Sequence, residues 1–233
     1  MTAITTTPTA DNAHAALIER ARKLPVAVIS DALDALSLPS SIMDASVRRF
    51  SGPKLVGIAR TVDRMPAAAN GSQADIGASL GMGTQVVLDS LVPGEVVVIS
   101  ARGDLAAAMI GDNMAHRARN QGATGFVTDG AIRDVDELAS MNLTIYAGGA
   151  IPRQAFKRFV TLSIDQPIVC GSVRVCRGDL VVGDADGVIV VGEKSIVAVL
   201  EKAEAIELVE QQMKVFINAG NSLVTAVEKY KQR

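Results

Sequence analysis

Two short polar stretches, each directly after an apolar run, carry the residues best suited to chemistry. They are Gly111-Asp112 and Arg133-Asp134, and 21 positions separate Asp112 from Arg133. An arginine can bind a carboxylate or a 2-oxo acid through two parallel hydrogen bonds. An aspartate offers the hard oxygen ligand that Mg²⁺ prefers. Together these groups suit a metal-bound 2-oxo acid whose enolate must be stabilised.

The residues after Gly111 predict an anion site. The pattern predicts a helix from about Asn113 to Gln121, ended by Gly122. Its first amides, near Asn113 and Met114, have no acceptor within the helix, and the helix dipole favours negative charge beside them. A glycine at 111 lets the backbone approach a ligand closely. This junction therefore favours a bound carboxylate.

Each of these residues also has a simpler structural explanation. Asp134 followed by Glu137 is typical of a variant capping box at a helix start. Asp112 could cap the helix that follows Gly111 in the same way. Arg133 alone is typical of a solvated surface arginine, and a solvent-facing His116 is favoured over one that faces a pocket. Local pattern thus supports an anion site without naming its ligand.

The amino-acid composition argues against several other kinds of functional site. The 233 residues fit one large domain or two small ones. The two histidines, His14 and His116, lie about a hundred positions apart, so a site of several histidine ligands cannot form within one chain. Any metal would be held mainly by oxygen, as Mg²⁺, Mn²⁺ or Ca²⁺ are. A net charge of −2 and 3% aromatic residues argue against nucleic-acid binding.

The cysteines and the first residues indicate an intracellular protein. Cys170 and Cys176 have the spacing of neither a zinc knuckle nor a redox pair, so we interpret both as small buried hydrophobes. Residues 1–12 lack a basic region and an apolar run, which predicts a flexible tail rather than a secretory signal. No apolar run has the length of a transmembrane helix. We expect a cytoplasmic protein without a membrane partner.

Apolar patterning before Pro152 predicts helices and strands, with a parallel α/β run over residues 106–147. Two helices, His14–Leu24 and Val26–Leu36, precede a loop over 37–53. Strands are expected at Lys54–Arg64, Glu95–Ala101, Ala106–Ile110, Ala123–Thr128 and Leu143–Ala147. Helices are expected between the last three strands, the second starting near Asp134. Such β-α-β-α-β units imply parallel strands with right-handed crossovers.

The remainder of the chain changes character after Pro152. Pro167–Val175 and Asp179–Val191 predict short antiparallel or barrel-like strands without a helix between them. Glu193–Gly220 predicts a long amphipathic helix, and Ser222–Lys231 a second one. We find no repeat and no domain linker. Residues 13–233 are therefore predicted to form a single α/β domain with a helical C-terminal arm.

The stretch GDNMAHRARNQGATGFVTDGAIRDVDEL (111–138) resembles the signature of the class II 4-hydroxy-4-methyl-2-oxoglutarate aldolase and oxaloacetate decarboxylase family. That family also includes the regulator of ribonuclease E activity A. The resemblance extends into YAGGAIPRQA (146–155), PIVCGSVRVCRGDLVVGDADGVIVV (167–191), the C-terminal helix and, weakly, KLVGIARTV (54–62). It implies a three-layer β/β/α swivelling domain that assembles as a homotrimer or as a homohexamer of two trimers.

The resemblance also implies roles for the polar stretches. A divalent cation, usually Mg²⁺, would be bound directly by Asp134 and otherwise through waters, one of them held by Asp112. Arg133 would bind the pyruvyl oxygen and stabilise the enolate. The amides around Gly111, Asn113 and Met114 would hold the substrate carboxylate.

A further acid is implied from a neighbouring subunit, whose C-terminal helix would bring a glutamate towards the metal waters. Glu207 and Glu210 are the candidates, and Glu210 is favoured. Two features depart from the family. Asn113 stands where a leucine is usual, which makes the pocket more polar, and the Gly-rich segment Asn70–Leu91, a region that helps to wall the site, is longer than expected.

These observations lead to a metal-dependent carbon–carbon lyase as the first hypothesis. It would cleave a 4-hydroxy-4-substituted 2-oxoglutarate, decarboxylate oxaloacetate, or do both, and release pyruvate as its enolate. A water activated by the metal, oriented by Asp112 and the partner glutamate, would act in proton transfer. Two alternatives stay open: a non-catalytic binding protein like the ribonuclease regulator, and a related lyase or hydratase whose substrate differs because of Asn113.

Overall fold

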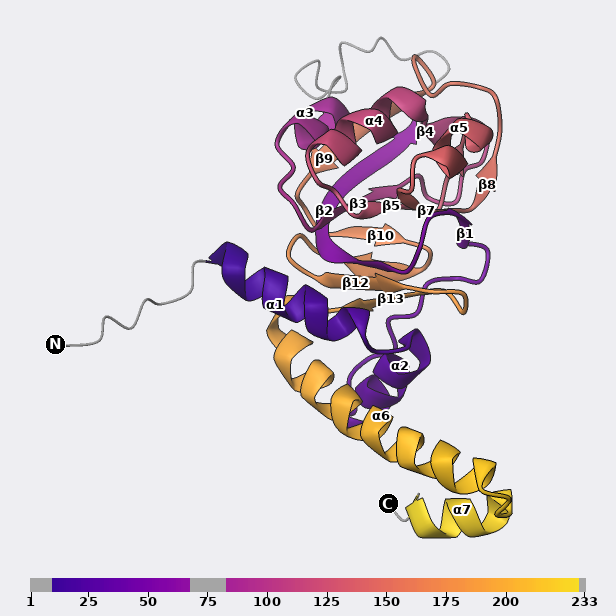
Figure 1. The fold of residues 1–233 in the computed structure, drawn as a ribbon. Coiled ribbons are helices and arrows are strands. Elements are labelled where there is room, and N and C mark those ends of the chain that lie inside the picture. The colour runs from indigo at the N-terminus through magenta and orange to yellow at the C-terminus, as the bar shows by residue number, and fades with distance from the viewer. Residues whose placement is uncertain (1–9, 68–82, 231–233) are drawn as a thin grey trace, which may run out of the picture.

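A mixed sheet of eight strands runs through the protein (Figure 1). The computed structural model describes residues 10–67 and 83–230. The strand order is β1-β7-β5-β3-β2-β12-β13, with β9 also paired to β2. The strands are β1 (Arg48–Ser51), β2 (Leu55–Pro66), β3 (Glu95–Ser100), β5 (Gly125–Thr128), β7 (Thr144–Ala147), β9 (Phe159–Ile164), β12 (Leu180–Gly183) and β13 (Val188–Val191). The neighbours β2, β3, β5 and β7 are parallel, as the β-α-β pattern predicts for β5 and β7.

Three short helices cover one face of the parallel strands (Figure 1). They are α3 (Gly83–Asp89), α4 (Asp112–Asn120) and α5 (Val135–Ser140). Ile99 and Phe126 of the sheet are fully buried with Leu88, Ala118 and Leu138 of these helices. Burial of this kind contributes roughly 1.5–3 kcal/mol for each large apolar side chain.

The other face of the sheet is closed by the sheet itself. β12 and β13 curl away from β2, and the hairpin of β10 (Ile168–Cys170) and β11 (Val173–Val175) completes the enclosure (Figure 1). Val98 and Tyr146 are buried there against Val190. The antiparallel strands predicted after Pro152 are thus confirmed. The thiols of Cys170 and Cys176 are free, but only Cys170 is fully buried.

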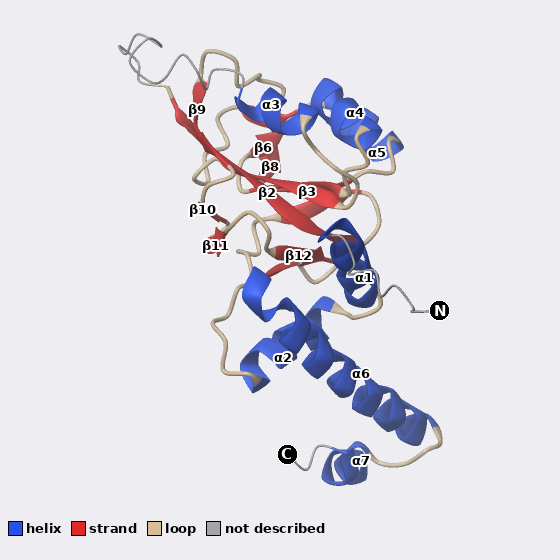
Figure 2. Ribbon diagram, turned by 90° about the vertical axis from the view of Figure 1, so that its left-hand side faces the viewer, coloured by secondary structure: helices blue, strands red, loops and turns tan. Residues whose placement is uncertain are grey.

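The outer helices form a third layer on β12 and β13. They are α1 (Ala10–Arg22), α2 (Val26–Ala35) and α6 (Ile196–Asn218), with α7 (Leu223–Tyr230) at the end of α6. Ile29 and Leu200 meet Ile189 in a separate apolar cluster. The outer end of α6 then extends away from the body with α7 (Figure 2). The layered α/β fold with a helical C-terminal arm is therefore confirmed.

A second, small parallel sheet lies beside the main one and was only partly predicted. It consists of β4 (Ala108–Ile110), β6 (Ala131–Ile132) and β8 (Gly149–Ala150). The run at 106–110 therefore does not continue the main sheet. The strands β1, β6 and β8 were missed because two to four residues are too few to show a period of two.

Two further differences concern the ends of elements. The helix α1 begins at Ala10, within the stretch expected as a tail. Most of the segment Asn70–Leu91 lies outside the described residues, and α3 is the part that can be followed. Within the two described ranges, no helix combines the length and apolar character needed to cross a membrane.

Candidate active site

The small sheet brings the two polar stretches together. Gly111 follows β4 and Arg133 follows β6, and these parallel strands pair with Ile110 opposite Ile132. The amide of Arg133 donates to the carbonyl oxygen of Ile110 at 3.0 Å, so the backbones stay in contact where the strands end. The carboxyl ends of parallel strands are where α/β proteins bind ligands.

The side chains at this edge are in direct contact. The amide of Asp112 donates to Oδ2 of Asp134 at 3.2 Å. Nε of Arg133 lies 3.3 Å from the same oxygen. The side chains of Arg133 and Asp134 remain 35% and 36% exposed. A cation, a carboxylate and a helix-opening amide therefore share one partly open site that a small anion can reach.

Gly111 makes this close contact possible through its lack of a side chain. Its φ of −142° is extended backbone that any residue adopts. A Cβ on this residue would lie 2.8 Å from Oδ2 of Asp134 and 2.9 Å from Nε of Arg133. The glycine is thus required by the space beside it rather than by its backbone angles.

Asp134 has a left-handed backbone, with φ 56° and ψ 40°. This region is disfavoured for residues with a Cβ, is tolerated best by Asn and Asp, and is common where function holds a residue in place. Asp134 occupies the N-cap position of α5, but its side chain makes no capping hydrogen bond. The capping-box alternative for Asp134 is therefore wrong, because the carboxylate is turned towards α4.

Asp112 is not a helix cap either. The N-cap of α4 is Gly111, and Asp112 is the first residue of the helix. Its Oδ1 accepts the amide hydrogen of Asn113 at 2.7 Å. That amide, which was predicted to bind an anion, therefore already has a carboxylate partner from its own chain.

The remaining predicted residues lie less centrally. Asn113 is exposed, and Met114 is half-buried against the core beneath α3 to α5. Nε2 of His116 lies 3.8 Å from Oε1 of Glu137, and both side chains are about half exposed. His116 thus faces α5 at the surface, as the sequence favoured.

Glu210 does not reach this site within one chain. It lies on α6, on the opposite side of the main sheet from α4 and α5 (Figure 1). Glu207 is on the same helix, and its Oε1 accepts a hydrogen bond from Gln211 at 2.9 Å. A contribution of either glutamate from another copy of the chain stays a prediction.

The oxygen donors at the site fit a magnesium-type cation. Nowhere in the described ranges do three His, Cys, Asp or Glu side chains gather as a metal cage. Mg²⁺ commonly takes only one or two protein carboxylates and completes its shell with water and substrate. Asp134, with Asp112 across the strand end, supplies that smaller set.

Sequence reasoning gave no role to Asp129, which follows β5. Its Oδ1 accepts the amide hydrogen of Ala101 at 2.6 Å, and its Oδ2 accepts that of Gly171 at 3.4 Å. Burial raises the pKa of Asp129. The residue ties the ends of β3 and β5 to the β10–β11 turn, beside a cavity of about 390 Å³. The Asp-Gly pair after a buried strand was the only signal for it.

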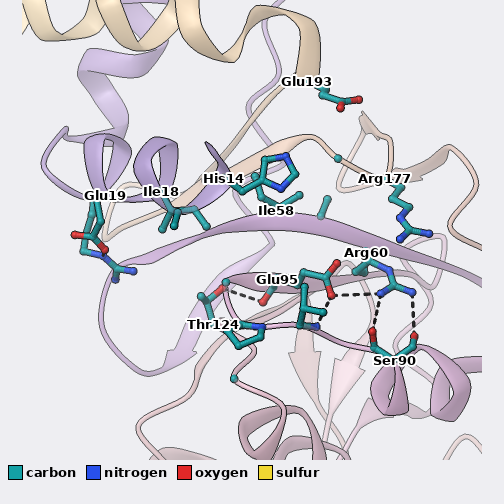
Figure 3. A pocket seen from close by; sticks show the side chains of 18 residues that line it. His14, Ile18, Glu19, Ile58, Arg60, Ser90, Glu95, Thr124, Arg177 and Glu193 are labelled. Carbon is teal, nitrogen blue, oxygen red and sulfur yellow. Dashed lines mark hydrogen bonds and ion pairs between the residues drawn. The ribbon is translucent and has the colours of Figure 1, made fainter. Parts of the chain in front are cut away.

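A larger cavity of about 1030 Å³ lies between α1 and the first half of β2 (Figure 3). Arg60, one of the cations that line it, is already paired with Glu95 at 3.3 Å and with Asp165 at 2.8 Å, and it also bonds Ser90. Because this charge is neutralised by the protein itself, the cavity offers less chemistry than the strand ends of the small sheet.

Fold and site together define a layered α/β protein in which a Gly-Asp and an Arg-Asp strand end meet in one site. The family described as RraA-like (Aldolase/RraA) matches residues 26–190, and the chain belongs to this family. The relationship indicated by 111–138 is thereby confirmed.

Known proteins resemble the chain over most of its length. It is 36% identical over 188 residues to a Halalkalibacterium halodurans protein named "Putative 4-hydroxy-4-methyl-2-oxoglutarate aldolase", covering 80% of this chain and 81% of that protein. An uncharacterized protein from Pseudomonas syringae has a TM-score of 0.82 at 27% identity and covers 98% and 99% of the two chains. Streptomyces coelicolor RraAS2, of the "RNase ES inhibitor RraA protein family", has a TM-score of 0.76 at 25% identity, covering 90% and 99%. Aldolase names and inhibitor names thus both occur among its relatives.

Proposed function

We propose that this protein is a divalent-metal-dependent lyase that cleaves a 2-oxo acid to give pyruvate. The observation that carries the proposal is the shared contact of Arg133 and of the Asp112 amide with one oxygen of Asp134. The aldolase name of the relative that is 36% identical supports the same chemistry. The substrates in view are 4-hydroxy-4-substituted 2-oxoglutarates and oxaloacetate.

The reaction breaks the bond between C3 and C4 of the substrate. The bonding electron pair stays on C3 as the enolate of pyruvate, and C3 then takes up a proton. In the aldol substrate the C4 hydroxyl loses its proton and becomes the carbonyl of the second product; in oxaloacetate C4 leaves as CO₂. Both reactions place negative charge on the oxygen of the 2-oxo group.

The residues of the site fit the needs of that enolate. The side chain of Arg133 is 35% exposed, and its guanidinium can donate to the 2-oxo oxygen and the adjoining carboxylate. The start of α4 favours the carboxylate through its amides near Met114. Asp134 and Asp112 would hold Mg²⁺ or a similar cation, which would supply further positive charge beside the 2-oxo group.

The site is proposed to be completed by neighbouring copies in a homotrimer or homohexamer. The C-terminal arm supports this because it exposes apolar side chains: Val215 is 71% exposed, Val224 69% and Leu223 61%. A helix that projects from the body with apolar residues in water is typical of a subunit contact. Glu210 would then come from the partner's α6. Light scattering of the full chain measures the number of subunits.

The test is pyruvate release from oxaloacetate and from 4-hydroxy-4-methyl-2-oxoglutarate, with Mg²⁺ and with a chelator. Turnover above the enzyme-free rate is expected only with the metal. Arg133→Ala should lower kcat by about 100-fold or more while the protein stays folded. Asp134→Asn, which tolerates the left-handed backbone, should raise the Mg²⁺ concentration needed for half-maximal rate. Full turnover by Arg133→Ala would disprove its assignment.

A second candidate is a non-catalytic binding protein, favoured by the likeness to the Streptomyces coelicolor RraA-family structure. Co-purification of a ribonuclease with the folded protein, with no pyruvate formed from either substrate, would support it.

A further inference from the structure

A second arginine, Arg64, lies near the end of β2 with few partners. Its Nη1 contacts Sδ of Met109 at 3.8 Å, a weak acceptor, and its Nη2 reaches the carbonyl oxygen of Phe159 at 3.4 Å. The guanidinium also lies 6.0 Å from the centre of the Phe159 ring. Its Nε is buried without a hydrogen-bond partner, and no carboxylate in the described ranges pairs with it.

Arg60, four residues earlier on the same strand, is an arginine whose charge is balanced by carboxylate partners. Two of its nitrogens bind the carboxylate of Asp165 at 2.8 and 2.9 Å, and Glu95 lies 3.3 Å away. Within residues 10–67 and 83–230 Arg64 has no such compensation, although it is half-buried among apolar side chains. Burial lowers the pKa of Arg64 to about 10. A charge kept in such surroundings is typical of a group that binds an anion from solution.

The position of Arg64 relates it to the candidate active site. The sulfur that it contacts belongs to Met109 of β4, and Gly111 comes two residues later, directly after the strand ends. Two residues of strand span about 7 Å. Arg64 therefore reaches the small sheet from β2, while Arg133 reaches its edge from β6.

We propose that Arg64 binds the distal carboxylate of a dicarboxylic 2-oxo acid whose 2-oxo end is bound at Arg133 and Asp134. This inference rests on the proposed function and makes it more specific. It assigns the site to substrates that carry a second carboxylate, as oxaloacetate and substituted 2-oxoglutarates do, and it excludes simple monocarboxylic 2-oxo acids as the preferred ligands.

The test compares a substrate with two carboxylates and one with a single carboxylate on the same protein. Cleavage of 4-hydroxy-4-methyl-2-oxoglutarate, whose distal carboxylate stays intact on the second product, needs both ends of the site, whereas exchange of the pyruvate methyl hydrogens with D₂O, followed by proton NMR, needs only the 2-oxo end. Arg64→Gln should lower the ratio of the two kcat/KM values by about 10- to 100-fold, the range of a charge-assisted hydrogen bond. Arg64→Lys, which keeps the charge, should recover part of that loss.

An independent measurement uses 2-oxoglutarate as an inhibitor of pyruvate exchange. Its inhibition constant should rise by about 10- to 100-fold in Arg64→Gln, because the variant loses the contact to the distal carboxylate. Arg158→Gln is the matched control: this exposed arginine lies beside Phe159, and in the described ranges its side chain donates to the carbonyl oxygen of Gln154 at 3.4 Å. It should leave both measurements unchanged.

The outcomes separate the two proposals. An unchanged ratio and an unchanged inhibition constant in folded Arg64→Gln would overturn the role of Arg64, and so would an equal effect of Arg158→Gln, which would indicate only a general charge effect. If wild-type protein exchanges no pyruvate hydrogens with Mg²⁺ present, the proposed function itself fails. Thermal unfolding of each variant shows that the fold is retained.

Discussion

Replacing Gly111 with alanine tests whether the site depends on the close approach of its two side chains. The new Cβ would lie 2.8 Å from Oδ2 of Asp134 and 2.9 Å from Nε of Arg133, whereas ordinary contact begins at 3.4 Å. The carboxylate and the guanidinium must therefore move by about 0.5 to 0.6 Å. Both groups are proposed to hold the reacting end of the substrate, so the substitution misplaces the chemistry directly.

The expected loss follows from that displacement. A misplacement of about 1 Å costs about 100-fold in rate, so we expect kcat/KM to fall by about 10- to 100-fold. Stability should change little, because the φ of −142° at Gly111 suits alanine. Alanine also restricts the unfolded chain, which stabilises a protein by about 0.4–1 kcal/mol and offsets part of the crowding.

Gly149→Ala is the matched control on the neighbouring strand β8. A Cβ there would meet only the methyl groups of Leu105, at 3.5 and 3.7 Å, which is ordinary contact. Metal-dependent pyruvate release and thermal unfolding are measured on both variants. Full turnover by Gly111→Ala, or an equal loss in Gly149→Ala, would refute the reasoning.

Two further predictions concern the supporting structure. Tyr146→Phe should lower the free energy of unfolding by about 1–2 kcal/mol in urea denaturation, because the phenol hydroxyl donates to the carbonyl oxygen of Asp184 at 2.6 Å; no measurable change would contradict this. The buried carboxyl group of Asp129 is tested through the pH dependence of the free energy of unfolding. Burial raises the pKa of Asp129 above the ordinary 3.8, so with rising pH the unfolded chain releases this proton before the folded protein does. The free energy of unfolding therefore falls as the pH rises, until the folded protein has released the proton as well. The unfolding free energy of wild type minus that of Asp129→Asn should therefore fall as the pH rises from the ordinary value of 3.8 through the raised pKa of the folded protein, and a difference that rises with pH would contradict the shift.

The sequence by itself determined the order of the main elements and the residues of the candidate site. Buried strands such as Glu95–Ser100 are long enough to be recognised from an unbroken apolar run, and Gly122 marks the end of α4. The stretches around Asp112 and Arg133 follow such runs directly. Because the ends of parallel strands lie at one edge of a sheet, their proximity was predictable from local pattern.

Only the tertiary structure decided how these residues are used. Strands of two or three residues, such as β6 and β8, carry no period, so the small sheet could not be predicted. The left-handed backbone of Asp134 contradicts the capping box that its sequence indicates, because contacts with α4 outweigh a local preference. Arg60 is paired with a carboxylate, whereas no carboxylate of the described residues pairs with Arg64. This difference likewise depends on residues about a hundred positions away, and a sequence pattern read along one strand does not contain them.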